Sequence, residues 1–158
     1  MSESSLIGKA KELYVATLLV DRKLHVYFPL VDNGFDLVVS KRDGSDFIPV
    51  QVKYKAVRSG FTLDRDDARK FADADAVLAF GSGSELDVRQ FYFIPAREWL
   101  ALAQNQDTQR GDNKLVVYLT QSSEWAKKFC GREGIETAFG RLLAQDSDEL
   151  ISPKSRCA

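Results

Sequence analysis

The stretch that decides the fold is GFDLVVSKRDGSDFIPVQVKY, residues 34–54. Two β-rich runs, 35–40 and 47–54, flank KRDGSD, whose Asp43-Gly44 pair is a strong signal for a tight turn with positive φ at its centre. We therefore predict a β-hairpin in which residues equidistant from the Asp43–Gly44 bond face each other. A longer turn with the same centre keeps this register, whereas a one-residue bulge destroys it.

The predicted register gives the hairpin one polar and one apolar face. Asp36 lies opposite Gln51, with Cβ atoms about 5 Å apart. Lys53 is two residues beyond Gln51, so strand alternation places it on the same face. The residue that faces Lys53 across the hairpin is Gly34, which has no side chain and so leaves space for the lysine. The apolar face is built from two facing pairs, Phe35 with Val52 and Leu37 with Val50.

A helix is predicted before the hairpin, capped by Ser4 or Ser5 and ending at about Arg22. Apolar and small residues recur along it at helical spacing, at Leu6, Ala10, Leu13, Thr17 and Val20.

Glu12 is the helix residue of chemical interest, because Val15, Ala16 and Leu19 fall on the same side of the helix. A carboxylate that borders an apolar stripe needs a partner. Gly8, one turn earlier, removes a side chain that would block access to it. The simpler alternative is an ion pair at the rim, with Lys9 or Lys11.

Strands and helices alternate outside this region. We expect strands at 25–30, 76–81, 90–95 and 114–120, and helices from Asp64 to about Ala72, from Pro95 to about 104, and over about 122–144, the last interrupted by Gly131, Gly134 and Gly140. The predicted fold class is α/β, a mixed β-sheet flanked by helices, antiparallel at its start and parallel afterwards. One domain spans 1–146, and a polar, flexible tail spans 147–158.

Composition narrows the function. The chain has 158 residues and a net charge of −1, which argues against a nonspecific nucleic-acid coat protein but permits a local basic groove. His25 is the single histidine, which excludes histidine triads and multi-histidine zinc sites. Cys130 and Cys157 form no C-x-x-C pair, and no signal-peptide or membrane-spanning run is present, so we expect a cytoplasmic protein without a membrane partner.

A basic surplus follows the hairpin: from Lys53 to Lys70 there are six basic residues and three acidic ones. Such a surplus can bind the phosphates of a nucleic acid, although a charged protein surface that contacts only solvent is the common alternative. The residues expected to contact DNA are Lys9, Lys55, Arg58, Arg65, Arg69 and Lys70.

The polar face of the hairpin suits phosphodiester hydrolysis, which needs a hard cation held by oxygen ligands beside the scissile phosphate. Asp36, Glu12 and the carbonyl oxygens of Gln51 or Val52 are the candidate ligands. The cation polarises the phosphate and lowers the pKa of a water molecule, while Lys53 orients that water and offsets developing charge. There is no fingerprint of a small-molecule cofactor.

The motif order GKAKELY, GFDLVV, turn, IPVQVK resembles the PD-(D/E)xK nuclease superfamily, which includes restriction enzymes, archaeal Holliday-junction resolvases and intron-encoded homing endonucleases. The resemblance implies a restriction-endonuclease-like fold, with Glu12 as the helix carboxylate, Asp36 as the central metal ligand and Lys53 as the strand lysine. Gln51 stands where most members have Asp or Glu. This QxK variant is similar to that of a cyanobacterial group I intron homing endonuclease, whose size the chain shares.

The resemblance implies a Mg²⁺-dependent endonuclease of double-stranded DNA, with Mn²⁺ as a possible substitute, that works as a homodimer or homotetramer. We expect a site-specific homing or restriction-like enzyme. A resolvase of Holliday junctions or other branched DNA is the alternative within the same chemistry. A non-catalytic DNA-binding module that retains the fold is the alternative outside it, motivated by Gln51 and the near-neutral net charge.

Overall fold

A computed structural model of the chain describes residues 2–31, 33–56, 60–105, 113–118 and 124–144. Its centre is a five-stranded sheet in the order β1-β2-β3-β5-β6. These strands are β1 (His25–Tyr27), β2 (Leu37–Ser40), β3 (Phe47–Lys55), β5 (Val77–Ser82) and β6 (Phe91–Pro95). β3 and β5 are parallel, as the strand–helix–strand pattern predicted, but β6 returns antiparallel to β5. The expectation of a sheet that stays parallel after the hairpin was therefore wrong.

The β2–β3 hairpin has the predicted register. Leu37 lies opposite Val50, and Ser40 lies opposite Phe47, so the centre falls between Asp43 and Gly44. The connection is longer than the expected tight turn, because the strands stop at Ser40 and resume at Phe47. Gly44 has φ of 78°, and its N–H donates to Lys41 O at 2.9 Å. The longer turn keeps its centre and therefore preserves the facing pairs.

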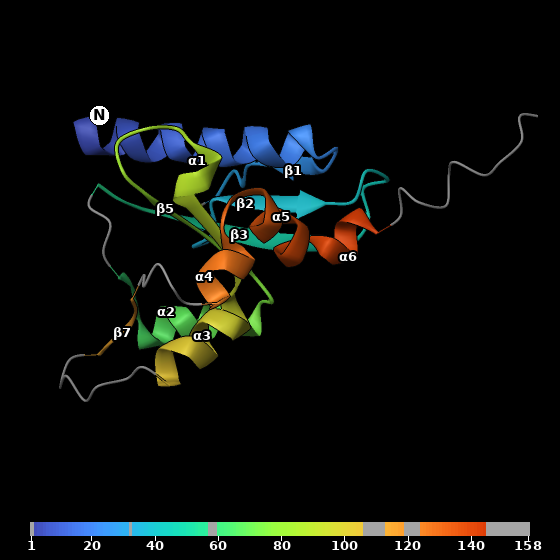
Figure 1. The fold of residues 1–158 in the computed structure, drawn as a ribbon. Coiled ribbons are helices and arrows are strands. Elements are labelled where there is room, and N and C mark those ends of the chain that lie inside the picture. The colour runs from blue at the N-terminus through green and yellow to red at the C-terminus, as the bar shows by residue number, and fades with distance from the viewer. Residues whose placement is uncertain (1, 32, 57–59, 106–112, 119–123, 145–158) are drawn as a thin grey trace, which may run out of the picture.

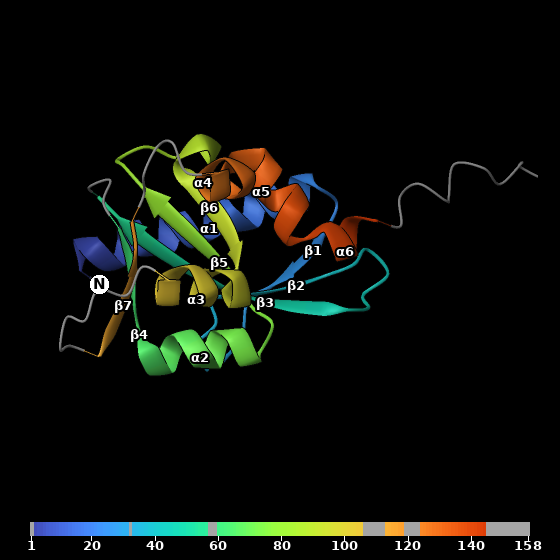
Figure 2. The ribbon, with the colours of Figure 1, turned by 60° about the horizontal axis from the view of Figure 1, so that its bottom comes forward.

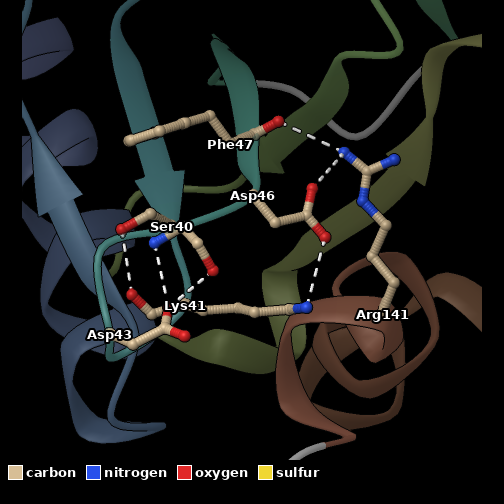
Figure 3. A network of polar contacts seen from close by, with 7 residues as sticks. Ser40, Lys41, Asp43, Asp46, Phe47 and Arg141 are labelled. Atoms are coloured by element: carbon tan, nitrogen blue, oxygen red, sulfur yellow. Dashed lines mark hydrogen bonds and ion pairs between the residues drawn. The ribbon is translucent and has the colours of Figure 1, made fainter.

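A polar network holds this turn against the C-terminal helix α6 (Gly140–Leu143), as Figure 3 shows. Arg141 donates to Phe47 O at 3.2 Å and lies 3.5 Å from an Asp46 carboxylate oxygen. Lys41 approaches the other carboxylate oxygen of Asp46 at 3.6 Å. A residue far along the chain thus ties down the point about which the hairpin folds.

Phe35 does not join the apolar face of the hairpin. It precedes β2, and its ring lies 5.6 Å from that of Phe71, on the opposite face of the sheet from Leu37. Strand alternation does not apply to a residue outside the strand. The predicted Phe35–Val52 pair was therefore wrong, whereas the Leu37–Val50 pair is confirmed.

Helix α1 (Glu3–Asp21) is capped by Ser2 rather than by Ser4 or Ser5, because the Ser2 hydroxyl accepts a 3.3 Å hydrogen bond from the N–H of Ser5. Its buried residues are Lys11, Val15, Ala16 and Leu19. The stripe recognised by spacing in the sequence lies on the exposed side of the helix: Leu6, Ala10, Leu13, Thr17 and Val20. Both sides of this helix are apolar, so spacing alone could not choose the buried one.

The sheet lies between two layers, with α1 on one side and α2 (Arg65–Asp73) and α3 (Ala96–Asn105) on the other (Figures 1 and 2). On the α1 side, Val15, Leu19, Val50, Phe93 and Phe139 are members of one buried core. On the α2 side, Phe71, Phe80, Trp99, Phe61 and Phe129 are members of another. Asp64 precedes α2 as predicted, although its side chain makes no capping hydrogen bond.

Two further segments differ from expectation. The expected strand at 114–120 is β7 (Lys114–Val117), and it pairs with β4 (Phe61–Asp64), a strand not foreseen, in a separate two-stranded sheet. The last helix is divided into α4 (Glu124–Phe129), α5 (Gly131–Ala138) and α6, and Gly131 has φ of 60° where α5 begins. A 3₁₀ turn, η1 (Val88–Gln90), precedes β6.

The expected tail 147–158 and residues 145–146 lie outside the described residues. Within the described part of the chain, no helix combines the length and apolar character needed to cross a membrane.

Candidate active site

The candidate site lies where the chain enters β2, beside the second half of β3. Asp36 Oδ2 accepts two hydrogen bonds of 2.7 Å, one from Gln51 Nε2 and one from the backbone N–H of Val52. The N–H of Asp36 donates to Val50 O at 3.0 Å. The carboxylate is therefore fixed against β3 by three successive residues, and the predicted proximity of Asp36 and Gln51 is present.

The amide of Gln51 is buried and links two oxygen atoms. Besides Asp36 Oδ2, its Nε2 lies 3.3 Å from Val52 O, to which it also donates. Both of these oxygens were predicted to bind a cation. The NH₂ group of Gln51 thus bridges them with its own hydrogen atoms, as a small positive group would.

Glu12 approaches from α1 and is paired with Lys9, whose Nζ lies 2.5 Å from Glu12 Oε2. This hydrogen bond raises the pKa of Lys9. The rim pair with Lys9 that the sequence allowed is therefore formed. The pair lies close enough to Asp36 for the charges of both Glu12 and Lys9 to act on its carboxylate.

Partial burial raises the pKa of Asp36 above its usual value, and the negative charge of Glu12 raises it further. The N–H of Val52 and the positive charges of Lys53 and Lys9 oppose this rise. Lys53 is exposed on β3, and its positive charge acts on Asp36. The charges of Glu12, Lys53 and Lys9 therefore all act on the carboxylate of Asp36.

Lys70 reaches the same region from α2. Its Nζ donates to Asn33 O at 2.9 Å and lies 5.7 Å from the centre of the Phe35 ring. We expected the space next to Gly34 to be free, but the Lys70 ammonium group fills it. A Cβ on Gly34 would collide with this group. Gly34 also has φ of 88°, a conformation that favours glycine.

The other residues expected to contact DNA have varied positions. Lys55 Nζ donates to Gly60 O at 2.8 Å, and Arg65 and Arg69 lie on α2, where Arg69 is exposed. Arg58 lies outside the described residues. Of the residues expected to contact DNA, Lys9 and Lys70 therefore lie next to the candidate site. A DNA contact by the other four residues stays a prediction.

The alternative that placed Lys11 at the rim, as a partner of Glu12, was wrong, because its side chain is only 3% exposed. Its Nζ donates to Glu85 O at 3.0 Å and lies 4.4 Å from the centre of the Tyr54 ring. The hydroxyl of Tyr54 donates to Gly83 O in the same loop. Burial lowers the pKa of Lys11. The available signal was that Lys11 lies four residues before the apolar Val15, on the buried side of α1.

The donor set fits a hard cation. Among the described residues, no three His, Cys, Asp or Glu side chains gather closely enough to form a metal site by themselves. Asp36 and Glu12 supply carboxylates, however, and Val52 O and Gln51 Oε1 are the neutral oxygens that Mg²⁺ also accepts. To offer Oε1, the Gln51 amide must turn over, which removes its NH₂ from the two oxygens that it now bridges.

No family model and no curated protein matches the chain. Solved structures do match, and they show the restriction-endonuclease-like fold, which confirms the predicted fold class. The bacterial homing endonuclease I-Ssp6803I aligns with a TM-score of 0.58 at 16% identity, over 91% of this chain and 98% of its own. The Holliday junction resolvase Hjc of the archaeal hyperthermophile Archaeoglobus fulgidus aligns with a TM-score of 0.55 at 13% identity, over 83% of this chain and 94% of its own.

Proposed function

We propose that the chain is a Mg²⁺-dependent DNA endonuclease that hydrolyses phosphodiester bonds. The observation that carries the proposal is the carboxylate of Asp36, which is fixed by Gln51 and Val52 and on which the charges of Glu12 and Lys53 act. This is the set of groups that hydrolysis of a charged diester requires: oxygen ligands for a cation, and a positive side chain for the developing charge. That one solved neighbour is a homing endonuclease and the other a Holliday junction resolvase supports a DNA substrate.

Each residue has a definite role in this proposal. Asp36, Glu12, Gln51 Oε1 and Val52 O would hold the Mg²⁺ ion, for which Mn²⁺ can substitute. When bound, the ion supplies positive charge at the scissile phosphate. Lys53 orients the attacking water and stabilises negative charge as it develops. Lys9, which now neutralises Glu12, and Lys70 are near enough to hold the DNA backbone, with Lys55, Arg58, Arg65 and Arg69 as more distant contacts.

A site-specific homing or restriction-like endonuclease that cuts double-stranded DNA is the form we favour, acting as a homodimer or homotetramer through one catalytic domain, residues 1–146. A resolvase is the second form, supported by the likeness to Hjc. The two forms differ in whether a linear duplex or a four-way junction is the preferred substrate.

The test incubates the full chain with supercoiled plasmid, a pool of random-sequence duplexes and a four-way junction, each with Mg²⁺, Mn²⁺ or EDTA. We expect cleavage of at least one substrate with either metal and none in EDTA. Asp36→Ala and Lys53→Ala should each lower the rate by about 100-fold or more. Lys127→Ala, an exposed change on α4, is the control. Cleavage of none of the substrates, or cleavage undiminished in both variants, would contradict the proposal.

A non-catalytic DNA-binding module is the competing function, and the Gln51–Asp36 hydrogen bond favours it, because it satisfies the carboxylate without a cation. Calorimetry separates the two readings. For an enzyme we expect Mg²⁺ or Mn²⁺ binding that disappears in Asp36→Asn, and DNA binding without cleavage in Ca²⁺. A module would bind DNA equally well in EDTA.

A further inference from the structure

The half of α1 that carries Glu12 is attached to the rest of the fold by an ammonium group. The structure describes every residue from Glu3 to Leu13, and among these only Lys11 has a buried side chain. The second half of the helix is held differently, by residues buried in the apolar core: Val15, Ala16 and Leu19. Apolar burial therefore fixes the second half of α1, whereas a polar contact fixes the first half.

Lys11 makes its contacts with the loop between β5 and η1 and with the end of β3. Its Nζ donates to Glu85 O at 3.0 Å and lies 4.4 Å from the centre of the Tyr54 ring. The Tyr54 hydroxyl donates to Gly83 O, and the N–H of Gly83 donates in turn to Lys55 O at 3.2 Å. The loop that receives Lys11 is thus itself tied to β3 by two hydrogen bonds, and Figure 1 shows this loop beside α1. We call Lys11, Tyr54, Gly83 and Glu85 the Lys11 anchor.

The Lys11 anchor is next in sequence to two residues of the candidate site, one on each side of the contact. Lys11 precedes Glu12 on α1, and Tyr54 follows Lys53 on β3. Glu12 and Lys53 are also residues whose charges act on Asp36. A shift of α1 along β3 would change the distances among these groups, and the contact between Lys11 and Tyr54 opposes such a shift.

The chemistry of Lys11 selects one position of the helix. An apolar side chain at the same place would stabilise any closely packed arrangement, and it would leave Glu85 O without this donor. A hydrogen bond needs its donor within about 3.2 Å of the acceptor and close to a straight line with it, so it favours one placement. Burial of the ammonium group costs free energy, which the carbonyl and the Tyr54 ring offset. A contact with that cost is suited to fixing a position and not to burial alone.

We propose that Lys11 is a positioning residue: through Glu85 O and Tyr54 it holds the first half of α1 at the place where Glu12 acts on Asp36. The attachment of the helix is a property of the fold alone. Its consequence, that Lys11 raises metal affinity without contacting the metal, rests on the proposed function. Lys11 acts through Glu12 and takes no part in the reaction itself.

Amide hydrogen exchange, followed by NMR on the full chain, tests the attachment without reference to activity. Lys11→Met removes the ammonium group and keeps a side chain of similar length. We expect the exchange rates of residues 8–14 to rise by about tenfold or more relative to those of residues 18–21, because only the first half of α1 loses its attachment. Lys11→Arg keeps a donor for Glu85 O and should restore most of the protection.

Phe129→Leu is the control for a general loss of stability, because it changes a buried residue of the other core. This variant should not raise the ratio of the two exchange rates. An unchanged ratio in Lys11→Met, or an equal rise in both halves of α1, would overturn the attachment. If Lys11→Met does not fold, Tyr54→Phe replaces it, since this variant loses only the bond to Gly83 O. A rise of the ratio by about threefold in Tyr54→Phe supports the attachment, and no rise overturns it.

Metal binding, measured by calorimetry with Mg²⁺ and Mn²⁺, tests the positioning of Glu12. If Lys11 acted by its charge alone, removal of that charge would strengthen the binding of a cation. A positioning role predicts the opposite sign: Lys11→Met should weaken metal binding by about tenfold, and Lys11→Arg should restore it. Phe129→Leu should bind metal as the wild type does.

A double-mutant cycle shows whether Lys11 acts through Glu12. In a Glu12→Gln background, Lys11→Met should cause no further loss of metal affinity. Tighter metal binding by Lys11→Met, or an equal loss with and without Glu12, would overturn the positioning role.

The two proposals fail in different ways. If the exchange ratio responds as expected but the wild type binds no metal and cleaves no DNA, the attachment of α1 stands, and both the nuclease function and the effect on metal affinity are refuted. If the wild type cleaves DNA with Mg²⁺ but neither the exchange ratio nor the metal affinity responds to Lys11→Met, the nuclease function stands and the positioning role is refuted.

Discussion

The side-chain amide of Gln51 donates a 2.7 Å hydrogen bond to Asp36 Oδ2. An acidic residue in place of Gln51, as in most members of the resembled superfamily, could not make this bond and would place a second negative charge beside Asp36. The amide therefore stabilises the site in the absence of metal. The same bond must break when Gln51 offers its oxygen to a cation, so metal affinity and metal-free stability are opposed at this residue.

Gln51→Glu should shift this balance. We expect a lower melting temperature than the wild type in EDTA, because the added carboxylate meets Asp36 without a donor between them. In Mg²⁺ the added charge should tighten metal binding by about tenfold, since affinity follows the number of charged ligands. Differential scanning fluorimetry over a Mg²⁺ series measures both effects. Gln104→Glu, exposed on α3, is the matched control, and identical curves for the two variants would refute this account.

Asp36 should make the metal-free protein less stable as the pH rises. Its pKa is raised in the native state, through burial first and Glu12 next, so the native state holds a proton that the unfolded chain has already released. The free energy of unfolding contributed by this group then falls as the pH climbs from the ordinary Asp value of 3.8 through the raised native pKa. Asp36→Asn keeps an acceptor for Val52 N–H and abolishes the loss. In EDTA its melting temperature should exceed that of the wild type at pH 7 and converge with it near pH 3.5; a difference that does not change with pH contradicts the assignment.

Gly34 and Gly8 form a matched pair of glycine positions. Gly34→Ala requires φ of 88° and drives a methyl group into Lys70 Nζ, so we expect a loss of more than about 1 kcal/mol in the free energy of unfolding. Gly8→Ala lies inside α1 with open space around the added carbon, and should gain about 0.5–1 kcal/mol. Urea denaturation measures both. Equal effects of the two substitutions would show that the Gly34 geometry is not a constraint.

Lys9 and Lys70 should contribute to DNA binding through phosphate contacts. Lys9→Gln and Lys70→Gln are each expected to reduce the slope of log K against log salt concentration by about 1, without changing sequence preference. Lys127→Gln on α4 is the control and should leave the slope unchanged. Fluorescence anisotropy in Ca²⁺ at several salt concentrations provides the measurement. A lysine that alters sequence preference but not the slope would be reading bases instead.

The hairpin register could be predicted from sequence because three local signals agree: the Asp43-Gly44 turn, the β-rich runs on either side, and the alternation from Gln51 to Lys53. The approach of Glu12 to Asp36 was a weaker inference, since it depends on how α1 docks. The side of α1 that is buried could not be read from spacing, because Leu13 and Val15 belong to equally apolar stripes on opposite sides.

Other features depend on contacts that no local pattern encodes. The pairing of β4 with β7 joins segments about fifty residues apart, and each is only four residues long. The burial of Lys11 requires a carbonyl from Glu85 and the ring of Tyr54, which meet only in the folded chain. The orientation of the Gln51 amide is likewise set by its two acceptors, Asp36 Oδ2 and Val52 O, and not by its place in a motif.

Because β3 lies between β2 and β5, the strand that carries Gln51 and Lys53 still has one unpaired edge when Lys53 leaves the ribosome. The edge of β3 that pairs with β5 carries unpaired backbone groups until Val77–Ser82 has also left the ribosome, an interval of about one to a few seconds at ordinary translation rates. Val50 and Val52 stand on that strand and would make its open edge prone to pairing with other nascent chains. Slow translation between residues 55 and 82 should therefore lower the yield of correctly folded protein more than the same delay placed after β6.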